Sequence, residues 1–174
     1  MTPIDPKFIR LFRFLWLLIT VVFSYSSLGF FYMAQLETSN LEAQTGQVKS
    51  IGVRSVNEKG HRNNTFPLFI LLNNSENEFR LSENFTNQFE RLQSDIKPGD
   101  EITIYHRNLF QTILGLGKPN DVFQINSGSK VILSINTIKS NYFLMSVFAA
   151  LLSTLSWLAY YYYRKNKANN KFAI

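Results

Sequence analysis

Two long uncharged stretches, one near each end, frame the chain. Residues 14–36 and residues 140–163 contain no charged side chain over 23 and 24 positions. A helix needs about 20 apolar residues to cross the hydrocarbon core of a bilayer. The hydrophobic pattern therefore predicts two transmembrane helices over these two stretches, with the more polar residues 37–139 between them.

The intervening segment alternates apolar and polar residues in short runs that are separated by turn signatures. Residues 101–107 alternate most clearly, with Ile102, Ile104 and His106 on one face. Residues 84–94 instead carry apolar residues at helical spacing. Further strands are expected over residues 47–56, 66–72, 78–81, 121–125 and 130–135. We expect a membrane α + β protein, in which a two-helix transmembrane hairpin encloses a small, mostly antiparallel β-barrel or β-sandwich domain with one short helix.

The basic excess of the chain lies on the flanks of the two apolar stretches. The net charge of +6 divides into +2 for residues 1–13, +4 for residues 164–174, and zero for residues 37–139, where 11 basic and 11 acidic residues balance. The positive-inside rule then predicts that both flanks are cytoplasmic tails. The central domain is expected to lie outside the cytoplasm. We expect a protein integral to the inner or plasma membrane. Since a nucleic-acid binder carries its basic patch on the folded domain, no nucleic-acid partner is expected.

Small residues recur at helical spacing within both apolar stretches. They are Thr20, Ser24 and Ser27 in the first, and Ser146, Ala150 and Ser153 in the second. Small residues let two helix backbones approach closely in lipid, so these faces are predicted to pack either on each other or on another membrane subunit. Neither stretch contains an ionisable Asp, Glu, Lys, Arg or His, which argues against ion transport by this chain alone.

The central segment offers little candidate chemistry. The chain has no cysteine and only two histidines, so neither a metal site nor a cofactor site is expected. His106, Arg107 and Lys118 are candidates for a small anion-binding patch at one rim of the domain. Residues 115–118 read Gly-Leu-Gly-Lys, but Pro119 stands where a phosphate loop needs serine or threonine, which favours a flexible loop. No serine lies in a recognisable nucleophile motif, and no catalytic residue is predicted.

Three runs carry a resemblance to a known family. They are TGQV at residues 45–48, IKPGDEITIY at residues 96–105 and VFQI at residues 122–125. Their layout resembles a family of uncharacterised bacterial membrane proteins, in which two transmembrane helices enclose a small extracytoplasmic β-domain. The resemblance covers most of the chain and implies this architecture. The family has no established catalytic residues, so the resemblance implies none here.

Two anchors and no catalytic constellation favour a non-enzymatic protein whose extracytoplasmic domain mediates protein interaction in the cell envelope. We expect the lipid bilayer and a membrane or envelope protein as partners, rather than a small molecule. An exposed sheet edge could recruit that protein by strand addition. Alternatives are a membrane protein that confers immunity against an envelope-acting toxin, an accessory subunit of a membrane complex, and an enzyme or receptor that uses the three basic residues.

Overall fold

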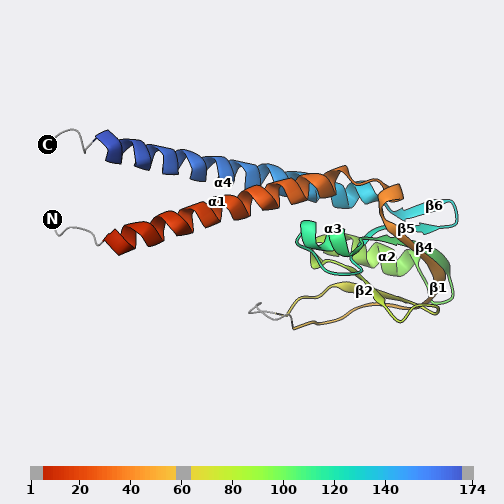
Figure 1. Cartoon of the computed structure of the whole chain (residues 1–174). Coiled ribbons are helices and arrows are strands. Elements are labelled where there is room, and N and C mark those ends of the chain that lie inside the picture. Colours follow the sequence, from red (N-terminus) through yellow and green to blue (C-terminus); the bar gives the residue numbers. More distant parts are fainter. Residues whose placement is uncertain (1–5, 58–63, 170–174) are drawn as a thin grey trace. The chain divides into compact units, whose positions relative to one another are not determined.

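The computed structural model describes residues 6–57 and 64–169, which divide into two compact units (Figure 1). The first, the helical unit, contains the chain up to Ala34 and from Asn141 onward. The second, the sheet domain, extends from Gln35 to Ser140. The expected domain of residues 37–139 lies within this range.

The helical unit contains most of two long helices, α1 (Pro6–Gln35) and α4 (Ile135–Asn169), which contain the expected spans. Gln35 and the first six residues of α4 belong to the sheet domain. Arg13–Gln35 and Ile135–Lys165 are long and apolar enough to cross a membrane. Only 11% of the most apolar window of each helix is buried. A core helix of a soluble protein would be mostly buried, so this exposure fits contact with lipid. Leu36, which we placed in the first span, lies beyond the end of α1.

The sheet domain contains a six-stranded antiparallel sheet with the strand order β3-β2-β1-β4-β5-β6. Its strands are β1 (Glu42–Val53), β2 (Leu68–Leu72), β3 (Glu78–Leu81), β4 (Glu101–His106), β5 (Val122–Ser127) and β6 (Lys130–Leu133). The long strand β1 joins two groups, because its first half pairs with β4 and its second half with β2. A bulge between Val48 and Ser50 separates the halves, and such bulges bend a strand.

The six strands form one open sheet, so our expectation of a β-barrel or a two-sheet sandwich is wrong. Closure would pair the edge strands β3 and β6, which stand at opposite ends of the strand order. The helical segment formed by η2 (Glu83–Gln88) and α2 (Phe89–Asp95) contributes Phe85, Phe89 and Leu92 to the core instead. From α2, Arg91 Nη2 donates a hydrogen bond to Ile132 O of β6 at 2.9 Å. The helical segment thus contacts β6, while β3 forms an isolated bridge from Arg80 to Asp121, just before β5.

Alternating burial along the strands builds the core of the sheet domain. In β4 the side chains of Ile102, Ile104 and His106 are buried, as the alternation predicted. The largest side chains of this domain that are less than 2% exposed are Leu68, Ile70, Leu72, Phe79, Leu81, Leu92, Ile96, Ile102, Ile104, Phe123 and Ile125. Burying each such side chain contributes about 1.5–3 kcal/mol, so this core can stabilise the domain without disulfides.

One end of the sheet gathers four strand ends and a helix that we did not expect. The register pairs Glu42, the first residue of β1, with His106, the last residue of β4, and His106 also pairs with Val122 at the start of β5. The helix α3 (Leu109–Leu114) connects β4 to β5 at this end. Strand β6 runs back toward the same end before α4 begins. Both connections to the apolar helices therefore leave the sheet near α3.

Candidate functional site

The first of the three expected anion-binding residues, His106, faces the core. It is 8% exposed, and its ring lies 5.1 Å from the ring of Phe79, which is fully buried. Its Nδ1 atom lies 3.3 Å from the backbone oxygen of Arg107. The position on β4 explains this orientation, because alternate side chains of the strand point into the core.

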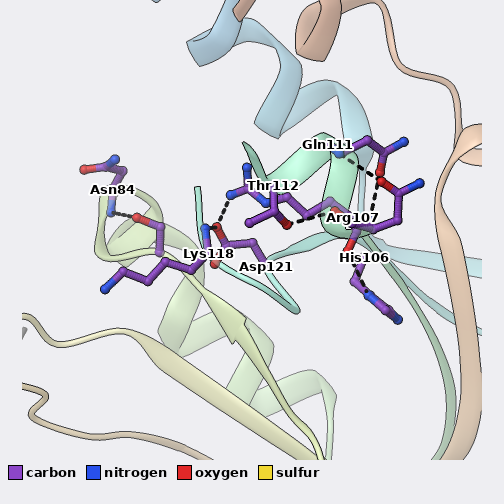
Figure 2. Close-up of polar contacts among 9 residues, drawn as sticks. Asn84, His106, Arg107, Gln111, Thr112, Lys118 and Asp121 are labelled. Carbon is purple, nitrogen blue, oxygen red and sulfur yellow. Dashed lines mark hydrogen bonds and ion pairs between the residues drawn. The ribbon is translucent and has the colours of Figure 1, made fainter. Parts of the chain in front are cut away.

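The second, Arg107, forms a buried ion pair with Asp121 across the ends of the β4–β5 loop (Figure 2). The Arg107 side chain is 2% exposed and that of Asp121 is 13% exposed. Asp121 Oδ2 also accepts a hydrogen bond from the backbone N–H of Lys118 at 3.0 Å. The guanidinium carbon of Arg107 lies 5.6 Å from the centre of the Phe123 ring. The charge of Arg107 is thus neutralised from within the domain.

The backbone of Gly117 lies directly against the Arg107 side chain. A Cβ atom added to Gly117 would lie 1.9 Å from three atoms of the Arg107 guanidinium group. The guanidinium therefore packs directly against the glycine backbone, an approach that any side chain would block. Within residues 115–118, which we expected to form a flexible loop, Gly117 and Lys118 contact the ion pair. The chemical reason for Gly117 is close packing rather than phosphate binding.

The third residue, Lys118, has its side chain directed away from the His106 ring (Figure 2). Its backbone helps to hold Asp121, as described above. The side chains of His106, Arg107 and Lys118 therefore do not converge on a common point. The resulting group of contacts, centred on Arg107 and Asp121, ties the beginning of the β4–β5 loop to its end. We refer to this ion pair as the loop clamp.

Within the helical unit, serines predicted to pack do lie between α1 and α4. Ser24 Oγ and Ser153 Oγ are 2.7 Å apart. Ser27 and Ser146 form a reciprocal pair, in which each hydroxyl donates to the other residue's backbone oxygen, at 3.1 and 3.0 Å. Such interhelical hydrogen bonds contribute about 0.6 kcal/mol each in a membrane. These serines therefore contribute to the packing of α1 against α4.

The other two predicted packing positions behave differently. Thr20 Oγ1 donates to Trp16 O of its own helix at 3.0 Å. Ala150 is exposed, while its neighbour Ala149 is 5% exposed. Trp16 Nε1 adds an interhelical hydrogen bond to Ser156 O at 2.7 Å. Sequence spacing alone could not identify these contacts, because the helix rotation that selects Ala149 depends on the partner helix.

A second candidate site, which the sequence analysis missed, is the outer face of β2. Buried residues Leu68, Ile70 and Leu72 alternate with Phe69 and Leu71, which are partly exposed on the opposite face. The signal was visible in the sequence, since five consecutive apolar residues in a strand give it two apolar faces.

Charged side chains border Phe69 and Leu71. The guanidinium carbon of Arg54 lies 4.4 Å from the centre of the Phe69 ring, and Arg54 also pairs with Glu78. Glu78 lies opposite Leu71 in the register, and Gly52 lies opposite Phe69. A Cβ atom added to Gly52 would meet nothing within 4 Å, so the surface beside Phe69 is open. We call Arg54, Phe69, Leu71 and Glu78 the outer patch.

The two sheet edges are poor sites for strand addition. Each edge strand, β3 and β6, has only four residues. On β3, Arg80 N donates to Asn120 O at 3.0 Å, and on β6 the Arg91 side chain covers Ile132 O. Short strands and covered backbone groups are features that prevent edge pairing. The outer patch is therefore the better candidate for protein contact.

Among residues 6–57 and 64–169, no group of three or more His, Cys, Asp or Glu side chains is placed to hold a metal ion. No protein-family model, curated protein or solved structure matches the chain. The resemblance to bacterial two-span membrane proteins therefore stays a prediction, and the function has to be argued from the geometry.

Proposed function

We propose that this chain is a non-enzymatic integral membrane protein whose sheet domain binds another protein of the cell envelope. In this proposal α1 and α4 cross the inner or plasma membrane with both termini in the cytoplasm. The sheet domain lies outside the cytoplasm and presents the outer patch to its partner. The observation that carries the proposal is the pair Phe69 and Leu71, partly exposed on the face of the sheet that does not form the core.

The composition of the outer patch supports protein recognition. Aromatic residues and arginine are enriched in the energetically dominant parts of protein interfaces. Arg54 stacked on Phe69 provides both in one place, and Glu78 pairs with the same guanidinium at the rim. A polar rim around an apolar centre is also the usual arrangement of an interface.

The charge distribution supports the orientation. The basic excess lies on the short terminal flanks, and the intervening residues 37–139 are neutral. A short flank rich in lysine or arginine stays on the cytoplasmic side. Since the chain has no cysteine, single cysteines can be introduced and labelled with an impermeant maleimide in intact cells. We expect Ser129→Cys to react in intact cells and a cysteine added after the last residue to react only after lysis. The reverse pattern would refute the orientation.

A photocrosslinking experiment tests the proposed binding site. A benzophenone amino acid replaces Leu71 in the full chain, expressed in its native membrane, and a matched sample carries it at Val131. Val131 is a suitable control because it is an apolar residue, 50% exposed, on the distant edge strand β6. We expect one envelope protein to crosslink from position 71 and not from position 131.

The same crosslink should depend on the aromatic ring. Phe69→Asp in the Leu71 crosslinking background should abolish the product, because a charge at the patch centre opposes burial in an interface. Equal crosslinking from positions 71 and 131, or a product that survives Phe69→Asp in a folded protein, would contradict the proposal. The identity of the captured protein would distinguish an envelope partner from a toxin or a membrane subunit.

A further inference from the structure

Helix α3 and the turn after it expose large apolar side chains. The exposed fractions of Leu109, Phe110, Ile113 and Leu116 are 71%, 63%, 60% and 58%. The opposite side of the helix is buried, through Gln111 and Thr112. Scattered exposed leucines need no explanation, but four large apolar side chains within eight residues form a patch, which usually marks an interaction surface. We call these four residues the α3 patch.

The backbone of Leu116, one residue of the α3 patch, has an unfavourable conformation. Its φ angle is +50°, in the left-handed region that glycine or asparagine adopts far more easily than leucine. The position follows the C-cap Gly115 of α3, where glycine is the usual residue after a helix. A leucine there whose side chain is 58% exposed contributes little to the core. Strain at an exposed apolar residue indicates a function for the side chain outside the domain.

A hydrogen bond ties α3 to the short segment that follows α1. Gln111 Nε2 donates to Asn40 O at 2.8 Å, and Asn40 is five residues after Gln35, the last residue of α1. Five residues span at most about 18 Å even when fully extended. Asn40 also belongs to the 3₁₀ helix η1 (Thr38–Asn40), which shortens this path. The β4–β5 loop is therefore bound to the segment that emerges from the first apolar helix.

The hydrogen bonds of α3 fix the direction of its apolar side. Asn108 Oδ1 accepts from Gln111 N at 2.9 Å, and Gln111 Oε1 accepts from Asn108 N at 3.0 Å. This capping box and the hydrogen bond to Asn40 both use the buried side of α3. The loop clamp then fixes the residues on both sides of the helix. These contacts give the exposed side of α3 a fixed direction relative to the sheet domain.

We infer that the α3 patch inserts into the headgroup region of the membrane that α1 and α4 cross, and so seats the sheet domain on the lipid surface. The inference rests on the membrane anchoring in the proposed function, but not on a protein partner. Interfacial helices bury their apolar face about 5–10 Å into the boundary between headgroups and acyl chains. Leucine, isoleucine and phenylalanine side chains suit that depth, and the short tether to α1 keeps them within reach of it.

Fluorescence quenching by spin-labelled lipid tests the inference in the full chain. Ile113→Cys is labelled with NBD, and single protein molecules are placed in nanodiscs of phosphatidylcholine with or without lipid that carries a doxyl group near the headgroup. The matched control is Ser129→Cys, in the β5–β6 turn at the opposite end of the sheet from α3. Leu144→Cys, in α4 and 70% exposed, serves as the membrane-inserted reference.

We expect the doxyl lipid to reduce NBD emission about twofold or more at position 113, because the patch lies within 5–10 Å of the acyl boundary. Emission at position 129 should be unchanged. Quenching at 144 without quenching at 113 would overturn the inference and leave the anchoring intact. A blue-shifted but unquenched label at 113 would also overturn it, since protein would then cover the patch. No quenching at 144 would refute the anchoring itself. Leu109→Cys repeats the test if Ile113→Cys does not fold.

Discussion

The loop clamp makes a specific prediction about the stability of the sheet domain. Asp121→Ala removes the carboxylate that pairs with Arg107 and leaves the guanidinium in place. The Arg107 side chain is 2% exposed, so water cannot replace the lost partner without local opening. Its Nε and Nη1 atoms already have no hydrogen-bond partner among the described residues. The variant also deprives the backbone N–H of Lys118 of its acceptor.

The expected loss is a large fraction of the stability of this domain. Removing one member of a buried ion pair typically lowers the free energy of unfolding by about 3–5 kcal/mol. A domain of this size has a total stability of only about 5–15 kcal/mol. At about 1.4 kcal/mol per factor of ten, core amides of β4 should exchange with deuterium some hundred- to several-thousandfold faster. The exposed acid Glu76 gives a matched control, because Glu76→Ala should change stability by no more than about 0.5 kcal/mol.

Hydrogen–deuterium exchange of the full chain in nanodiscs measures this loss. A double variant, Arg107→Met with Asp121→Leu, separates the buried unpaired charge from the loss of packing. Replacing both partners by apolar residues of similar size is often neutral or stabilising, so the part of the loss that comes from the unpaired guanidinium should return, while the Lys118 N–H still lacks its acceptor. A loss below about 1 kcal/mol for Asp121→Ala would refute the assignment of a desolvated ion pair. A double variant as unstable as Asp121→Ala would show that shape, rather than charge, is what the site requires.

Three further substitutions test other parts of the structure. Gly46→Ala should destabilise the sheet domain by no more than about 1 kcal/mol, measured by amide exchange in β1, because its Cβ would displace the exposed Asn74 side chain and break its 2.8 Å hydrogen bond to Thr45 O. Leu116→Gly should stabilise the domain by about 1 kcal/mol, since it relieves a leucine with φ of +50°, and should weaken doxyl quenching at position 113. Ser153→Ala should weaken the packing of α1 on α4 by about 0.6 kcal/mol in a denaturant titration of the helices, because Ser24 loses its 2.7 Å contact.

Local patterns in the sequence predicted most of the strands. The strand predicted at residues 78–81 is β3 (Glu78–Leu81), and the strand predicted at residues 101–107 is β4 (Glu101–His106). In both cases turn residues flank a run with a period of two, so neighbours along the chain determine the element. The two apolar helices were predicted for a similar reason, because length and lack of charge are local properties.

The openness of the sheet could not be predicted in this way. Whether β3 pairs with β6 depends on long-range contacts: Arg80 N of β3 donates to Asn120 O, and Arg91 of α2 donates to Ile132 O of β6. The expected short helix in this region is confirmed by α2 (Phe89–Asp95), but its position against β6 follows from contacts such as Arg91 with Ile132. Barrel and open sheet share the same pattern of alternating residues, so only long-range packing distinguishes them.

The helix α3 was missed because it is too short to produce a periodic signal. Isolated helices of six residues are unstable, so tertiary contacts must hold this one. One local signal was present: Asn108 followed three residues later by Gln111 is a capping box. The hydrogen bond from Gln111 to Asn40 joins residues 71 positions apart and could not be read from the sequence. The same holds for Arg107 and Asp121, which only the β4–β5 register brings together.

Four of the six buried polar residues among the described part of the sheet domain, His106, Arg107, Gln111 and Thr112, lie at the β4–β5 loop, and stability alone does not explain this. An apolar replacement of a buried ion pair usually stabilises a domain as well as the pair does. Arg107, Asp121 and Gln111 together fix the start, the end and the helix of the β4–β5 loop. Hydrogen bonds are directional and apolar contacts are not. These hydrogen bonds therefore give the exposed side of α3 a defined orientation. The Arg107→Met with Asp121→Leu variant should therefore recover stability and yet reduce the doxyl quenching of a label at Ile113. If the variant were stable and the label were quenched as strongly as before, the loop clamp would not be needed to place α3 on the membrane.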